Sequence, residues 1–179
     1  MKFYGDHSGP LMHSTFWIPL TDEEINVDID MSHVIISIKA PKDLAEFYHK
    51  SLDKIKNIIL KFKKKKIRTS LFINPSINDI KTSYKLGSDC VEIHTGRLSR
   101  LVKLKKNYSK ELNRIKRCSI IAKKIGLEVH AGHGLDYKTT ELLSRFKEIE
   151  EFNIGHYLIG ESVFFGLSNV IKKFKKIIK

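Results

Sequence analysis

Two short apolar runs that end in glycine beside histidine are the most informative part of the chain. They are Leu127–Leu135 (LEVHAGHGL) and Phe152–His156 (FNIGH). Glycine lets a substrate or phosphate group approach the backbone closely, and histidine exchanges a proton near neutral pH. Two such strand ends with a helix between them bring two imidazoles and several backbone N–H groups to one rim of a parallel sheet. We therefore expect a polar pocket at that rim.

A third apolar run, Cys90–His94 (CVEIH), carries a carboxylate in its middle. Alternation along a strand places Cys90, Glu92 and His94 on one face. A carboxylate on an inward face is costly unless it is hydrogen-bonded, so Glu92 marks either a polar site or an exposed sheet face. The histidines also have structural alternatives: His133 as a polar residue in a glycine-rich turn, and His156 as a cap on a backbone group.

From about residue 43 the hydrophobic spacing alternates between helical and strand periods. The pattern predicts strands at 67–73, 90–94, 127–131 and 152–159, and helices over 43–62, 76–87, 112–125, 139–149 and a single final stretch from Phe164 to Ile178. Strands separated by helices pair in parallel through right-handed crossovers. The fold class is therefore α/β, either an open sheet or half of a barrel.

Residues 1–42 do not continue this rhythm, and we expect them to form a divergent N-terminal segment beside a main domain over 43–179. Met1–Thr21 reads as irregular because of its Gly and Pro residues. Ile25–Ile29 and Val34–Ile38 are strand candidates and predict a two-stranded add-on. No chemistry can be assigned to this segment from its sequence.

The length, composition and net charge limit the fold and the kinds of binding partner. A chain of 179 residues with 41% apolar residues suits one globular domain. The net charge of +13 allows a polyanion as a partner, so a basic nucleic-acid-binding protein is one alternative. It is the weaker one, because lysines are scattered and no basic platform interleaved with aromatic residues is visible.

The chain shows no metal-binding or export signal. Cys90 and Cys118 form no CxxC pair or zinc spacing, and we expect buried free thiols. The remaining histidines also lack ligand spacing, so no metal site is predicted. We find no signal peptide and no run of the roughly 18 apolar residues that a membrane span needs, so a soluble cytoplasmic protein is expected.

Four segments together resemble the pyridoxine 5′-phosphate synthase family of vitamin B6 biosynthesis. They are Arg68–Ile73 (RTSLFI), Val91–Gly96 (VEIHTG), His130–Leu135 (HAGHGL) and Phe152–His156 (FNIGH), the last running into Ile159-Gly160. The resemblance covers about residues 50–179. It implies a partial (β/α)8 TIM barrel, a half-barrel made of the last four βα units.

The resemblance also implies an activity. Family members condense 1-deoxy-D-xylulose 5-phosphate with 3-amino-2-oxopropyl phosphate, without a metal or organic cofactor, and form homo-oligomers. His133 is similar to the family's proton donor, and Glu92 to the carboxylate that stabilises the transition state. Gly134, Gly155 and His156 resemble its contacts to the phosphorylated substrates. Phosphate sites of such barrels commonly follow strands seven and eight, which is where these glycines would lie.

The first fifty residues depart from the family pattern. They lack its Asn-x-Asp-His strand and its histidine and glutamate bases, and the faint likeness at Val27–His33 is attributed to chance. Ring closure needs several proton transfers, so we expect this chain alone to be poorly active. A further alternative is a non-catalytic half-barrel that binds phosphorylated metabolites or self-associates through its open sheet edges.

Overall fold

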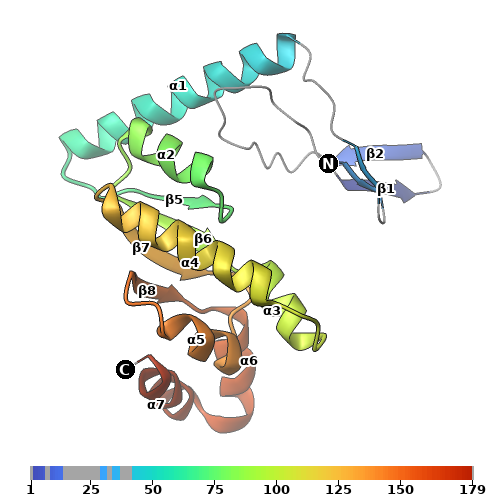
Figure 1. The fold of residues 1–179 in the computed structure, drawn as a ribbon, viewed down its shortest axis with the longest axis vertical. Coiled ribbons are helices and arrows are strands. Elements are labelled where there is room, and N and C mark those ends of the chain that lie inside the picture. The colour runs from blue at the N-terminus through green and yellow to red at the C-terminus, as the bar shows by residue number, and fades with distance from the viewer. Residues whose placement is uncertain (1, 7–8, 14–28, 32–33, 37–41, 179) are drawn as a thin grey trace. The chain divides into compact units, whose positions relative to one another are not determined.

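The structure is a computed structural model that describes residues 2–6, 9–13, 29–31, 34–36 and 42–178 (Figure 1). The chain divides into two compact units, Met1–Ile58 and Ile59–Lys179. Helix α1 (Lys42–Lys64) crosses the boundary between them. In the described part of the chain, no helix is long and apolar enough to span a membrane.

The described residues of the first unit form two antiparallel hairpins before α1. Strand β1 (Lys2–Asp6) pairs with β2 (Gly9–His13), and β3 (Ile29–Met31) pairs with β4 (Val34–Ile36). The irregular structure expected for Met1–Thr21 is therefore wrong for β1 and β2. A two-stranded sheet consists of edges alone, where proline without its N–H is tolerated, so Pro10 is compatible with a strand.

The two strands expected from the sequence in this unit have different outcomes. The candidate at Val34–Ile38 is confirmed over the residues of β4. The candidate at Ile25–Ile29 lies outside the described residues, except for Ile29, which begins β3.

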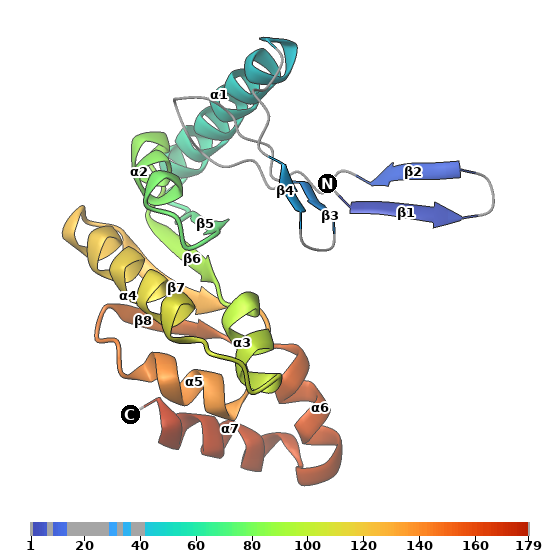
Figure 2. The same cartoon turned by 45° about the vertical axis from the view of Figure 1, so that its right-hand side comes forward.

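The second unit contains a parallel sheet, as predicted, and its four strands lie in chain order. Figures 1 and 2 show β5 (Ser70–Ile73), β6 (Cys90–His94), β7 (Glu128–Gly132) and β8 (Ile149–Asn153) side by side. The helices are α2 (Ile77–Leu86), α3 (Gly96–Lys103), α4 (Ser109–Lys124), α5 (Tyr137–Ser144), α6 (His156–Phe165) and α7 (Leu167–Ile177). Helices α2, α4 and α5 contact β5, β7 and β8 respectively. The α/β class is thus confirmed.

Local sequence signals explain several helix boundaries. The Ser76 side chain accepts a hydrogen bond from the Asp79 N–H and caps α2. Gly87 ends the same helix in the left-handed conformation at φ 86°. Asp136 and Thr139 form a reciprocal capping box at the start of α5. The predicted start and stop of α2 are therefore confirmed.

The two faces of the sheet differ in chemistry. Val91, Ile93, Val129 and Ala131 are fully buried on the face that the helices cover. The strand register places a second set in one row across the other face: Phe72, Glu92, His130 and Glu151. Alternation along each strand separates the buried apolar set from this second set, in which only Phe72 is apolar.

Two predictions for the last elements are wrong, and one helix is not predicted. The strand expected over 152–159 is instead β8, which ends at Asn153, and the helix α6, which begins at His156. A short apolar run does not distinguish a buried strand from a helix by its periodicity. The single final helix is two helices, because Gly166 lies between α6 and α7 at φ 77°. The polar stretch after Gly96 contains α3, a helix that the sequence pattern does not predict.

Candidate active site at the carboxyl ends of the strands

A cavity of about 790 Å³ lies where β6, β7 and β8 end. The structure brings all five predicted site residues to this one cavity: Glu92, His133, Gly134, Gly155 and His156. The other lining residues are Phe72, Leu135, Asn153, Tyr157, Gly160, Glu161 and Phe164. Residues far apart in the sequence therefore meet, because parallel strands present their carboxyl ends at the same edge.

Residues on β7 and β8 fix the position of the Glu92 carboxylate, which projects from β6. The Asn153 side-chain amide donates a hydrogen bond of 2.8 Å to Glu92 Oε2. A Cβ atom at Gly132 would lie 1.8 Å from Glu92 Oε1. Only glycine leaves room for the carboxylate at this point of β7, so Gly132 and Asn153 together fix where the negative charge lies.

His133 lies in the turn that follows β7, and its backbone is held in an unusual conformation. Its φ is 73°, a left-handed conformation that costs a non-glycine residue of order 1 kcal/mol or more. The buried Thr95 hydroxyl lies 2.9 Å from the Gly132 carbonyl and 2.8 Å from the His133 carbonyl, within donor reach of both. Thr95 thereby stabilises the turn that presents His133 to the cavity.

The imidazole of His133 stacks on that of His94, with ring centroids 4.5 Å apart and planes at 29°. The Phe72 ring lies beside both imidazoles. Its centroid is 5.4 Å from that of His94 and 6.2 Å from that of His133. Burial, and then the neighbouring His133, lower the pKa of His94 below its ordinary value. These surroundings therefore favour the neutral form of the His94 imidazole.

The start of α6 forms another side of the cavity through Gly155, His156 and Tyr157. Backbone N–H groups in the first turn of a helix have no partner within the helix, and the helix dipole favours negative charge there. This is the geometry of many phosphate sites. Apart from Gly155 and its two neighbours in the chain, no described residue places an atom within 4 Å of the position that a Cβ would take at Gly155, so this side of the cavity has open space for a ligand.

Sequence reasoning missed the residues that position the predicted ones. Asn153, Gly132 and Thr95 contact Glu92 or the turn of His133, and the sequence pattern marks none of them as functional. Asn153 is recognisable only as the polar residue that ends its strand two positions before Gly155. Alternation places His94 on the correct face, but nothing in a single sequence indicates that its ring stacks on His133.

The fold and the cavity define the class: an α/β protein whose parallel strands end at a pocket with an imidazole, a carboxylate and a helix start. The family described as "Pyridoxal phosphate biosynthesis protein PdxJ" matches residues 47–179. The chain belongs to this family, and the resemblance drawn from the four sequence segments is confirmed.

Similar proteins agree with this assignment. A pyridoxine 5′-phosphate synthase of Pelagibacter ubique is 57% identical over 128 residues, which is 72% of this chain and 54% of that protein. The protein of the same name from a Sulfurihydrogenibium species is 45% identical over 127 residues, 71% of this chain and 51% of that one. The protein of the same name from Blochmanniella floridana is 40% identical over 128 residues, which is 72% of this chain and 51% of that protein. The chain thus spans about half the length of the curated relatives it matches.

Proposed function

We propose that the chain carries the carboxyl-terminal part of a pyridoxine 5′-phosphate synthase active site. The reaction is the condensation of 1-deoxy-D-xylulose 5-phosphate with 3-amino-2-oxopropyl phosphate. The observation that supports this most is the single cavity shared by His133, Glu92, Gly134, Gly155 and His156. Membership of the family supports the substrate class, two phosphorylated small molecules.

In this proposal each group has a defined task. His133 donates a proton to an oxygen that leaves as water during ring closure. The Glu92 carboxylate stabilises the positive charge that develops as the amine condenses with a carbonyl. The N–H groups at the start of α6, with Gly155 and His156, bind one phosphate, and Gly134 contacts the phosphate of the amino ketone.

The same proposal extends to the architecture. The four strands are the last four of an eight-stranded TIM barrel, and their polar face, with Glu92 and His130, is the barrel interior. The reaction takes place in the cytoplasm and uses no metal or organic cofactor. Residues 1–50 carry none of the family's base motifs. The chain alone therefore has the proton donor but not the proton-accepting bases, and it converts the substrates slowly.

Substrate binding and turnover test these statements separately. We expect calorimetry to show binding of at least one phosphorylated substrate to the full chain and His133→Ala to weaken it, with the exposed His49→Asn as the matched control. Absence of binding for both substrates would refute the site. A turnover assay is expected to give little product, and a rate like that of intact family members would refute the poor activity of the isolated chain.

We also propose that the chain forms a homo-oligomer. Val163, Phe164 and Phe165 on α6 are 78%, 82% and 61% exposed within the described part of the chain, and β5 and β8 are the outer strands of the sheet. Exposed apolar patches and open strand edges favour association. Light scattering on the wild type should give a mass above one chain, and Val163→Asp should lower it. A monomeric wild type would refute the proposal.

A further inference from the structure

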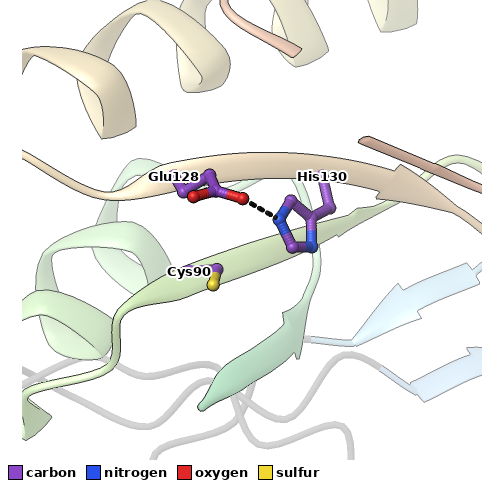
Figure 3. A group of neighbouring side chains, drawn as sticks. All are labelled: Cys90, Glu128 and His130. Atoms are coloured by element: carbon purple, nitrogen blue, oxygen red, sulfur yellow. Dashed lines mark hydrogen bonds and ion pairs between the residues drawn. The ribbon is translucent and has the colours of Figure 1, made fainter. Parts of the chain in front are cut away.

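A second group of chemically active side chains lies at the opposite end of the sheet's polar face. Cys90 is the first residue of β6 and Glu128 is the first of β7, and the two are register partners. His130 follows two positions after Glu128, so its side chain projects from the same face. Figure 3 shows the hydrogen bond between the Glu128 carboxylate and the His130 imidazole, with Cys90 on the neighbouring strand. One ligand atom from each lies within 4.8 Å of the others.

The donor atoms suit a divalent ion of intermediate softness. Sulfur, imidazole nitrogen and carboxylate oxygen are the three kinds of ligand that zinc takes from proteins. His130 Nε2 is 2.9 Å from Glu128 Oε1, a hydrogen bond that a metal ion bound to both side chains would replace. Cys90 and His130 are only 3% and 6% exposed, so both are held by their surroundings and have little freedom to turn away.

The surroundings of His130 match those of a metal ligand. Its other ring nitrogen, Nδ1, lies 3.6 Å from the Glu151 carboxylate on the next strand. A carboxylate behind an imidazole orients the ring and makes it a stronger donor, and it is a recurrent partner of metal-bound histidine. At this distance the two groups are not hydrogen-bonded, so Glu151 is a nearby carboxylate that can support the ring from its far side rather than a bonded partner.

A positive charge already lies beside two of the three donors. Arg68 Nη2 is 3.1 Å from Cys90 Sγ and 2.5 Å from Glu128 Oε2. The arginine side chain is 63% exposed, and exposed ion pairs are weak. A metal ion can therefore displace the guanidinium into solvent, so Arg68 is a competitor for the position that the cation would take.

We propose that Cys90, Glu128 and His130 form a three-ligand site for Zn²⁺ or a similar divalent cation, with a fourth position open to water. Cys90 binds as the thiolate, and its proton passes to solvent. None of the three residues is among those that line the cavity with His133. The site is therefore independent of the substrate pocket and of the proposed synthase function.

Cobalt provides the direct test, because Co²⁺ bound to a thiolate gives a sulfur-to-metal charge-transfer absorption. The full chain is treated with chelator, dialysed and titrated with Co²⁺, and Zn²⁺ is then added. We expect the absorption to saturate at one ion per chain and to be abolished by Zn²⁺. Cys90→Ala should remove it, while Cys118→Ala, the matched variant at the other buried thiol, should retain it.

Two variants keep the test decisive if Cys90→Ala fails to fold, which circular dichroism will show. Arg68→Ala should bind Co²⁺ more tightly than the wild type, because it removes the competing cation. Glu151→Gln should bind about tenfold more weakly, through loss of support for His130. The proposal is overturned if neither the wild type nor Arg68→Ala shows the charge-transfer absorption, or if Cys90→Ala retains it.

Discussion

The two faces of one parallel sheet have separate tasks in this protein. Beneath the helices, Val91, Ile93 and Val129 are fully buried and have no polar side-chain atoms. On the opposite face, Glu92 and His130 lie in register with each other, and each contacts another polar side chain within hydrogen-bond distance. A substitution on the apolar face should therefore change stability, whereas one on the polar face should change binding.

The largest expected effect comes from the apolar face. Ile93→Ala should lower the free energy of unfolding by about 2–5 kcal/mol, because it removes buried methylene groups and leaves a cavity. Phe72→Leu on the opposite face is the comparison, since Phe72 is 47% exposed, and it should cost less than about 1.5 kcal/mol. Urea denaturation monitored by circular dichroism measures both. Equal losses for the two variants would contradict the division between the faces.

Gly132→Ala should produce the next largest effect, at the point where the polar face touches the backbone. The new Cβ would lie 1.8 Å from Glu92 Oε1 and must displace the carboxylate. Overpacking of this kind costs about 1–3 kcal/mol, and substrate affinity should fall with it. Gly126→Ala is the control: alanine is strained there at a φ of 91°, but Gly126 is not among the residues that line the cavity, so this variant should lose stability and keep its substrate affinity. Wild-type affinity in Gly132→Ala would show that the position of Glu92 is unimportant.

The buried thiol of α4 should make stability decline at alkaline pH. Burial raises the pKa of Cys118 from an ordinary 9.0 to about 11. The unfolded chain therefore loses this proton at a lower pH than the folded chain, so the thiol's contribution to stability is fully present below pH 9 and is lost as the pH rises through 11. The loss should reach about 2 kcal/mol near the upper of these two values. Urea denaturation across this pH range should show a steeper decline for the wild type than for Cys118→Ala; parallel curves would contradict this.

The sequence predicted the sheet well because the signals for β6 and β7 are local. The run Cys90–His94 predicts β6 with its correct bounds, and Ser76 and Gly87 correctly mark both ends of α2. The pattern fails where an apolar run can serve two elements, so His156 is predicted in a strand although it begins a helix. The hydrogen bond from Asn153 to Glu92 joins residues 61 positions apart, and no periodicity in a single sequence encodes such a contact.

The same distant contact gives the smallest expected change in stability and the clearest test of the polar face. Asn153→Ala removes the amide that donates to Glu92 Oε2, a partly solvated hydrogen bond worth about 1 kcal/mol. Its effect on binding should be larger than its effect on folding, about tenfold in affinity for a phosphorylated substrate, because the carboxylate loses its orientation. Calorimetry measures the affinity, and urea denaturation of the same sample measures the stability.

Asn153→Gln tests whether the amide orients Glu92, since a longer amide that reaches Glu92 should restore part of the affinity. If Asn153→Ala instead lowers stability by several kcal/mol and leaves affinity unchanged, Asn153 belongs to the scaffold and the two faces of the sheet are not separate in function.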